Sequence, residues 1–87
     1  MKYIKALINE GKAEEAITLL EQLVKKGTKN DEVYYLLGNA YRKLNNVRLA
    51  LNNYLEAIHI NPDSPAKEAH DMLIEIMDFY NKDMYNQ

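Results

Sequence analysis

The chain has 87 residues, with eleven basic and thirteen acidic side chains, a net charge of −2 and no cysteine. This length suits one small domain, the lack of cysteine excludes disulfides and thiolate metal sites, and the slight acidic excess argues against a nucleic-acid binder. No apolar run approaches the roughly 18 residues of a membrane span, and Lys5 interrupts an N-terminal stretch too short for a secretory signal. We therefore expect a cytoplasmic protein that binds neither nucleic acid nor membranes.

Apolar residues recur three and four positions apart in five segments, and this spacing predicts five helices. The first is expected over residues 3–9, because Gly11 breaks the pattern shortly afterwards. The second is expected over residues 12–25, where Gly27 is placed as a C-terminal stop.

The third helix is expected over residues 31–44, with Asn30 or Asp31 as its N-cap. Asn45-Asn46 is a short turn signal. The fourth helix then follows over residues 46–60, so the third and fourth helices should pair closely across this turn.

The last predicted helix follows a proline-rich turn. Asn61-Pro62 ends the preceding helix, because the residue before a proline avoids the helical region. Ser64-Pro65 then indicates an N-cap followed by proline at the first helical position. We expect this helix over residues 65–82 and a flexible tail over residues 83–87. Because all the turns are short, neighbouring helices should be antiparallel.

The sequence repeats itself at an interval of 34 residues. Like residues coincide when the chain is shifted by this interval: Ala6 with Ala40, Ala16 with Ala50, Ile17 with Leu51, and Val24 with Ile58. A period of this length, made of two helices, indicates a helical repeat architecture in which each unit buries its apolar face on the next.

Residues 31–64 carry the most complete unit, in which aromatic and small residues alternate at fixed spacing: Tyr34, Leu37-Gly38, Tyr41, Ala50, Tyr54, Ala57 and Pro62. This pattern resembles the tetratricopeptide repeat family. Its first helix carries a large aromatic residue, Leu-Gly and Tyr, and its second helix carries Ala, an aromatic residue and Ala before a closing proline. The small residues fit where paired helices cross closely.

The resemblance implies an all-α superhelix of antiparallel helix-turn-helix repeats, with five helices in a single domain over residues 1–82. Residues 1–30 would form a truncated first repeat, residues 31–64 the second, and residues 65–82 a capping helix. With about two residues inserted before the last helix, Ile74 falls on Gly38. Because Ile74 replaces the glycine at which paired helices cross closely, we expect no close-packed second helix after the capping helix.

The sequence contains no motif for catalysis, phosphate binding or metal coordination. His59 and His70 are expected on different helices, and neither has a second His or Cys at ligand spacing. We therefore expect a protein that is not an enzyme and needs no metal or cofactor.

In the family that the chain resembles, the first helices of successive repeats line a concave groove that binds peptides. We expect Lys5, Tyr35, Asn39 and Arg42 in this groove, because the last three are spaced four and three apart on one helix face. Tyr35 would anchor the ligand, Asn39 would bond a backbone amide, and Arg42 and Lys5 would favour an acidic side chain. Gly38-Asn39 matches family members that clamp a carboxylate, but Tyr35 stands where those members have Lys.

An alternative is that the groove is too shallow to bind a ligand. Arg42 would then pair with an acidic row on the last helix, formed by Asp71, Glu75 and Asp78.

The last helix has more apolar residues than one buried stripe requires, among them Met72, Ile76 and Phe79, again four and three apart. An end helix normally needs a polar outer face. An apolar excess therefore predicts an interface, and the chain would be a scaffold that forms a homodimer through this helix. The alternative is that these residues wrap Tyr54 and Ile58, with the tail at Met84 and Tyr85 covering the rest.

Overall fold

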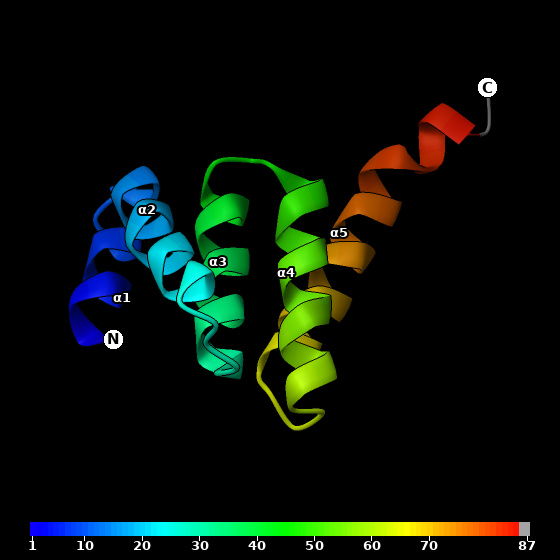
Figure 1. Ribbon diagram of the computed structural model, residues 1–87. Helices are drawn as coiled ribbons and strands as arrows, with labels where there is room; N and C mark the ends of the chain where they lie inside the picture. Colours follow the sequence, from blue (N-terminus) through cyan, green and yellow to red (C-terminus); the bar gives the residue numbers. More distant parts are fainter. Residues whose placement is uncertain (86–87) are drawn as a thin grey trace.

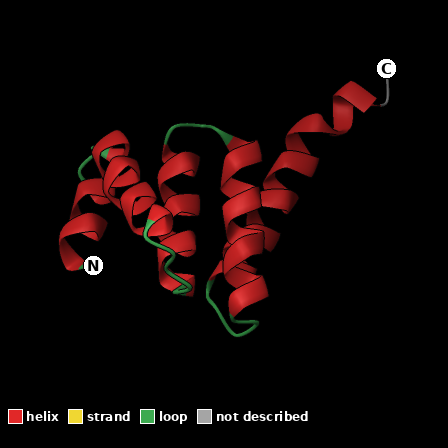
Figure 2. Ribbon diagram, in the orientation of Figure 1, coloured by secondary structure: helices red, strands yellow, loops and turns green. Residues whose placement is uncertain are grey.

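The computed structural model describes the backbone of residues 1–85 and the side chains of residues 1–80, and this part of the chain is entirely helical apart from its turns (Figures 1 and 2). The helices are α1 (Lys2–Asn9), α2 (Ala13–Lys25), α3 (Asp31–Lys43), α4 (Val47–Ile60) and α5 (Ala66–Tyr85). Each helix packs on the one before it, so the array runs from α1 at one end to α5 at the other. The predicted all-α architecture of five helices is confirmed.

Three of the turns share one backbone geometry. Gly11, Gly27 and Asn45 follow the ends of α1, α2 and α3 with positive φ angles of 81°, 88° and 61°. In each turn the next residue donates its N–H to a carbonyl five positions back: Lys12 to Leu7 at 2.8 Å, Thr28 to Leu23 at 3.3 Å, and Asn46 to Tyr41 at 2.9 Å. This is the Schellman motif, and Asn45 takes the place of the glycine in the third turn.

Side-chain caps begin the last three helices, since the first N–H groups of a helix lack carbonyl partners. Asn30 accepts from the N–H of Glu32 at 2.9 Å, which decides between the two expected caps of α3. Asn46 caps α4, because its side-chain oxygen accepts from the N–H of Leu49 at 3.2 Å. Ser64 accepts from the N–H of Ala66 at 3.0 Å, as predicted for α5.

The helix α5 continues to Tyr85, beyond the expected end at residue 82. The predicted tail therefore begins inside this helix, and residues 86–87 lie outside the described part of the chain. At 1.5 Å per residue, twenty residues give a helix about 30 Å long. Its C-terminal turns project away from α4 (Figure 1).

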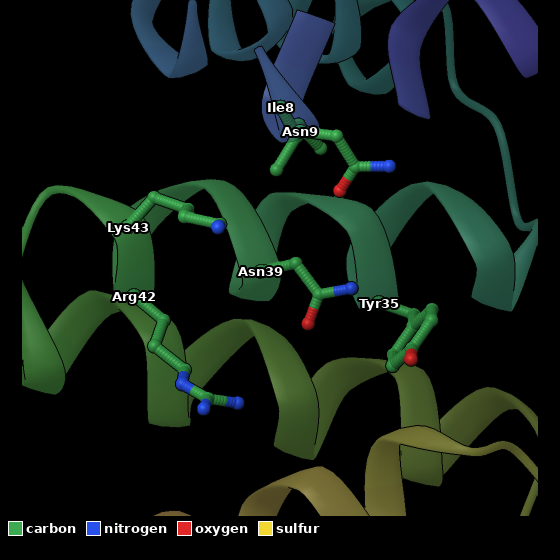
Figure 3. Close-up of a pocket in the computed structure, with 6 residues that line it drawn as sticks. All are labelled: Ile8, Asn9, Tyr35, Asn39, Arg42 and Lys43. Carbon is green, nitrogen blue, oxygen red and sulfur yellow. The ribbon is translucent and has the colours of Figure 1, made fainter. Parts of the chain in front are cut away.

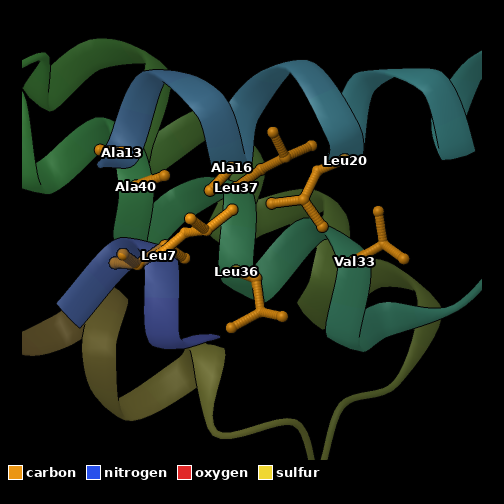
Figure 4. Packing of buried hydrophobic residues seen from close by; sticks show 9 residues of the cluster. Leu7, Ala13, Ala16, Leu20, Val33, Leu36, Leu37 and Ala40 are labelled. Atoms are coloured by element: carbon orange, nitrogen blue, oxygen red, sulfur yellow. The ribbon is translucent and has the colours of Figure 1, made fainter. Parts of the chain in front are cut away.

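One core cluster joins α1, α2 and α3 (Figure 4). Alanines at the crossings let the helices approach, and leucines fill the space beside them. The buried members are Leu7, Ile8, Ala13, Ala16, Leu20, Val33, Leu36, Leu37 and Ala40. Leu36 on α3 is 3% exposed and belongs to this core. The short first helix contributes to this core because it packs on α3 as well as on α2.

A second cluster lies between α3, α4 and α5, with Tyr54 at its centre. Tyr54 is fully buried, and its ring lies directly against Gly38. A Cβ at position 38 would lie 3.0 Å from Cζ of this ring and would overlap Cδ1 and Cε1. The predicted close crossing of α3 and α4 at Gly38 is therefore confirmed.

Several apolar residues of the helices lie outside these clusters, and Tyr3 and Leu44 are two of them. Tyr3 is 68% exposed and Leu44 is 43% exposed. Both lie at helix ends, where no neighbouring helix covers them, and a single exposed apolar side chain is normal for a small domain.

Candidate functional site

A hollow of about 400 Å³ lies between the C-terminal end of α1 and the exposed face of α3 (Figure 3). A second hollow of about 260 Å³ adjoins it and extends it toward Lys5. The two share Ile8, Asn9, Tyr35 and Asn39, so together they form one groove. We call it the α1–α3 groove; its full lining is Lys5, Ile8, Asn9, Tyr35, Leu36, Asn39, Arg42 and Lys43.

The four residues that the sequence placed in a groove all line this one. Lys5 contributes from α1, and Tyr35, Asn39 and Arg42 contribute from α3. The three α3 residues share a face because their spacing of four and three matches the helical period. Whether they bind a ligand stays a prediction, but the structure does bring them together.

The groove also includes residues that were not among those four candidates. Shifting the chain by 34 residues places Ile8 on Arg42 and Asn9 on Lys43. The groove is therefore lined by equivalent positions of the two repeats. This internal correspondence is the sequence signal that identifies Asn9 and Lys43 as lining residues.

A hydrogen bond from the buried Tyr54 sets the orientation of the Asn39 side-chain amide. The Tyr54 hydroxyl donates to Oδ1 of Asn39, with an oxygen–oxygen distance of 2.6 Å. The carbonyl oxygen of this side chain is thus engaged, and its NH2 group remains as the hydrogen-bond donor. The contact with a ligand backbone amide stays a prediction, in which Asn39 would donate to a carbonyl oxygen.

Burial keeps the Tyr54 hydroxyl protonated. It raises the pKa of Tyr54 above its ordinary value of 10.0, while the neighbouring Arg42 guanidinium acts in the opposite direction. A tyrosine hydroxyl is already neutral at physiological pH, and the raised pKa widens the pH range over which this one stays protonated and available to donate. The Tyr35 ring lies beside it, with centroids 6.2 Å apart and planes tilted by 38°.

The charges at the groove are mainly positive. Arg42 and Lys43 are exposed at one end. Lys5, at the other end, pairs with Glu32 at 3.4 Å, and both side chains are partly exposed. The Lys5 charge is therefore partly compensated, which the sequence did not indicate, and Arg42 and Lys43 dominate the local potential.

The acidic row on α5 does not pair with Arg42. Asp71 instead contacts His70 at 3.1 Å and Lys67 at 3.5 Å on its own helix. The hydrogen bond from His70, followed by the charge of Lys67, lowers the pKa of Asp71. Among the described side chains, no ion pair involves Arg42, so the alternative in which this row neutralises the groove is not supported.

The three apolar candidates on α5 are exposed. Met72 is 54%, Ile76 37% and Phe79 75% exposed. They do not wrap α4, because Leu73 and Met77 on an adjacent face pack into the Tyr54 cluster instead. The expected cover by Met84 and Tyr85 concerns side chains outside the described residues.

The described residues offer no metal site and no membrane span. No group of three His, Cys, Asp or Glu side chains among them could hold a metal ion. No helix within the described range has the length and hydropathy to cross a bilayer.

Comparisons with known proteins match this architecture. Residues 31–64 match a family model described as tetratricopeptide repeat, and residues 1–26 match a second model with the same description. The solution NMR structure of the Bacteroides fragilis protein BF1650 is 55% identical, covers 99% of this chain and 88% of its own, and superposes with a TM-score of 0.86. No curated protein matches the sequence.

Proposed function

Since the chain belongs to the tetratricopeptide repeat family, whose repeats are generally non-catalytic protein–protein interaction modules, we propose that it binds a peptide segment of a partner protein in the α1–α3 groove. The observation that supports this most is the lining of the groove. Equivalent positions of both repeats meet there and present polar side chains above a buried floor of Ile8 and Leu36.

The ligand that suits this lining is an extended peptide with an acidic side chain. Asn39 would donate its NH2 group to a backbone carbonyl, in the orientation that Tyr54 imposes. The half-buried ring of Tyr35 would pack against an apolar side chain. Arg42 and Lys43 would pair with a carboxylate, since hydrogen bonds between charged groups are roughly twice as strong as neutral ones.

The dimensions of the groove limit the affinity. A hollow of about 400 Å³ accommodates only a few residues of a peptide. Binding must also offset the cost of ordering that peptide. We therefore expect dissociation constants in the micromolar range, equivalent to about −8 kcal/mol or weaker.

A peptide-display selection tests the proposal directly. The wild-type protein should enrich peptides with Asp or Glu, and a Tyr35→Ala, Asn39→Ala, Arg42→Ala triple variant should lose that enrichment. A matched control replaces three exposed residues of α2: Glu14→Ala, Gln22→Ala and Lys25→Ala. This control should select the same peptides as wild type. Identical selections from the groove variant and the wild type would rule out the groove as the binding site.

A further inference from the structure

Met72, Ile76 and Phe79 form an exposed apolar row on α5, which we call the α5 row. Their spacing of four and then three residues is the pattern by which two helices pair along a shared seam. The helix α5, which carries this row, lies at the opposite end of the helix array from α1 (Figure 1). A surface there can act independently of the groove.

The repeat explains why this row is apolar. With the two-residue insertion, Met72 and Ile76 correspond to Leu36 and Ala40 of α3. Those two residues are buried in the first core cluster, which α1 and α2 build on that face of α3. By contrast, α5 packs on α4 through Leu73, and its row has no equivalent cover among the described residues.

The continuing stack of a further repeat would not cover this row. Ile74 occupies the position of Gly38, where α3 and α4 touch so closely that no Cβ fits. A helix packed on α5 as α4 packs on α3 would therefore collide with the Ile74 side chain. That face is also different from the α5 row, because residues 74 and 76 point in directions about 160° apart at 100° per residue.

We propose that the α5 row pairs with the same row of a second copy of the chain, with the two helices antiparallel about a two-fold axis between residues 75 and 76. This arrangement makes the row self-complementary. Each Met72 faces the Phe79 of the other copy, a favourable contact between sulfur and an aromatic ring. The two Ile76 side chains meet near the axis. A parallel pair would align the helix dipoles and stack each residue on its own copy.

The exposed area is what such a dimer needs. Tyr80, which touches Phe79 edge-on at 5.6 Å, is itself 70% exposed and extends the row. With about 200 Å² for a large exposed side chain, these four residues leave roughly 450–500 Å² open on each copy. Complete burial of these side chains on both copies would remove roughly 900–1,000 Å² from water. This area lies within the range of about 700–1,100 Å² for the non-polar part of a standard interface.

Sedimentation across a concentration series measures this association. The mass should rise from 10.1 kDa toward twice that value as the concentration increases into the high micromolar range. Phe79→Gln should weaken dimerisation at least tenfold. The matched control, Tyr3→Gln, alters a similarly exposed aromatic residue on α1 and should leave dimerisation unchanged. A monomer at every concentration would overturn the proposal, as would equal dimerisation by both variants.

The absence of native cysteine allows the orientation to be read by disulfide cross-linking. Ile76→Cys should form a disulfide dimer under mild oxidation. Met72→Cys alone should not, because in the antiparallel pair its two copies lie about 10 Å apart along the axis, too far for a disulfide. Mixing Met72→Cys with Phe79→Cys should restore cross-linking. A disulfide between two Met72→Cys chains, without one at Ile76→Cys, would contradict the antiparallel arrangement.

Discussion

Replacing Gly38 by alanine tests the packing that holds the repeat together. In an exposed helix, Gly→Ala stabilises by about 1 kcal/mol through helix propensity. Here the new Cβ would overlap two ring carbons of Tyr54, a side chain with no exposed surface. The ring cannot swing into solvent, so either it or the whole of α4 must shift.

Overpacking of this kind costs about 1–3 kcal/mol, and the overlap with a fully buried ring places Gly38→Ala in the upper half of that range. Subtracting the gain in helix propensity leaves a net destabilisation of about 1–2 kcal/mol. For a domain of this size, that corresponds to a fall in melting temperature of about 5–15 °C. Circular dichroism at a fixed protein concentration measures it, since association would make the transition concentration-dependent.

The same substitution in a Tyr54→Leu background separates the clash from other effects. Without the ring, Gly38→Ala should become neutral or stabilise by up to about 1 kcal/mol. The sign of the effect should therefore depend on Tyr54, which a double-mutant cycle reveals. If Gly38→Ala stabilised the wild type, or had the same effect in both backgrounds, the close crossing of α3 and α4 would be wrong.

Three further predictions concern single contacts. Ser64→Ala removes the buried cap of α5 and should cost about 0.5–2 kcal/mol in urea unfolding; no change in midpoint would contradict the capping role. Asn45→Gly should raise stability slightly, and Asn45→Ala should lower it by about 1 kcal/mol, because position 45 has a φ of 61°; the reverse order in thermal melts would refute this explanation. The pKa of Tyr54 is raised in the folded state, so its contribution to stability should be complete below pH 10 and decline as the pH rises through the folded value. Spectroscopic titration should show a late-ionising tyrosine that is absent from the Tyr54→Phe variant. An unchanged late ionisation in that variant would contradict the assignment to Tyr54.

The helices could be predicted because their signals are local. The positions of Gly27, Asn46 and Ser64 mark helix ends through caps and turns that involve only neighbouring residues. The groove face of α3 followed from the same periodicity. The repeat pattern predicted which helices pair. A glycine at position 38 leaves space for the Tyr54 ring only where α3 and α4 cross.

The details of the groove could not be predicted, because they depend on contacts across the fold. Nothing in the sequence indicates that Tyr54 donates to Asn39, fifteen residues away, and so leaves its NH2 group free to donate to a ligand. The pairing of Lys5 with Glu32 likewise requires α1 and α3 to be placed in space. The burial of Leu36 in the floor of the groove also depends on packing between helices, which periodicity alone does not show.

Peptide binding in the α1–α3 groove is tested most directly by NMR titration with an acidic peptide obtained from the selection. The side-chain NH2 signals of Asn9 and Asn39 report on two sides of the groove. The Asn39 signal should shift on saturation in the micromolar range, while those of Asn52 and Asn53 on α4 stay in place. Binding that leaves the Asn39 NH2 signal unmoved, with shifts confined to α5 or α4, would contradict the proposed function.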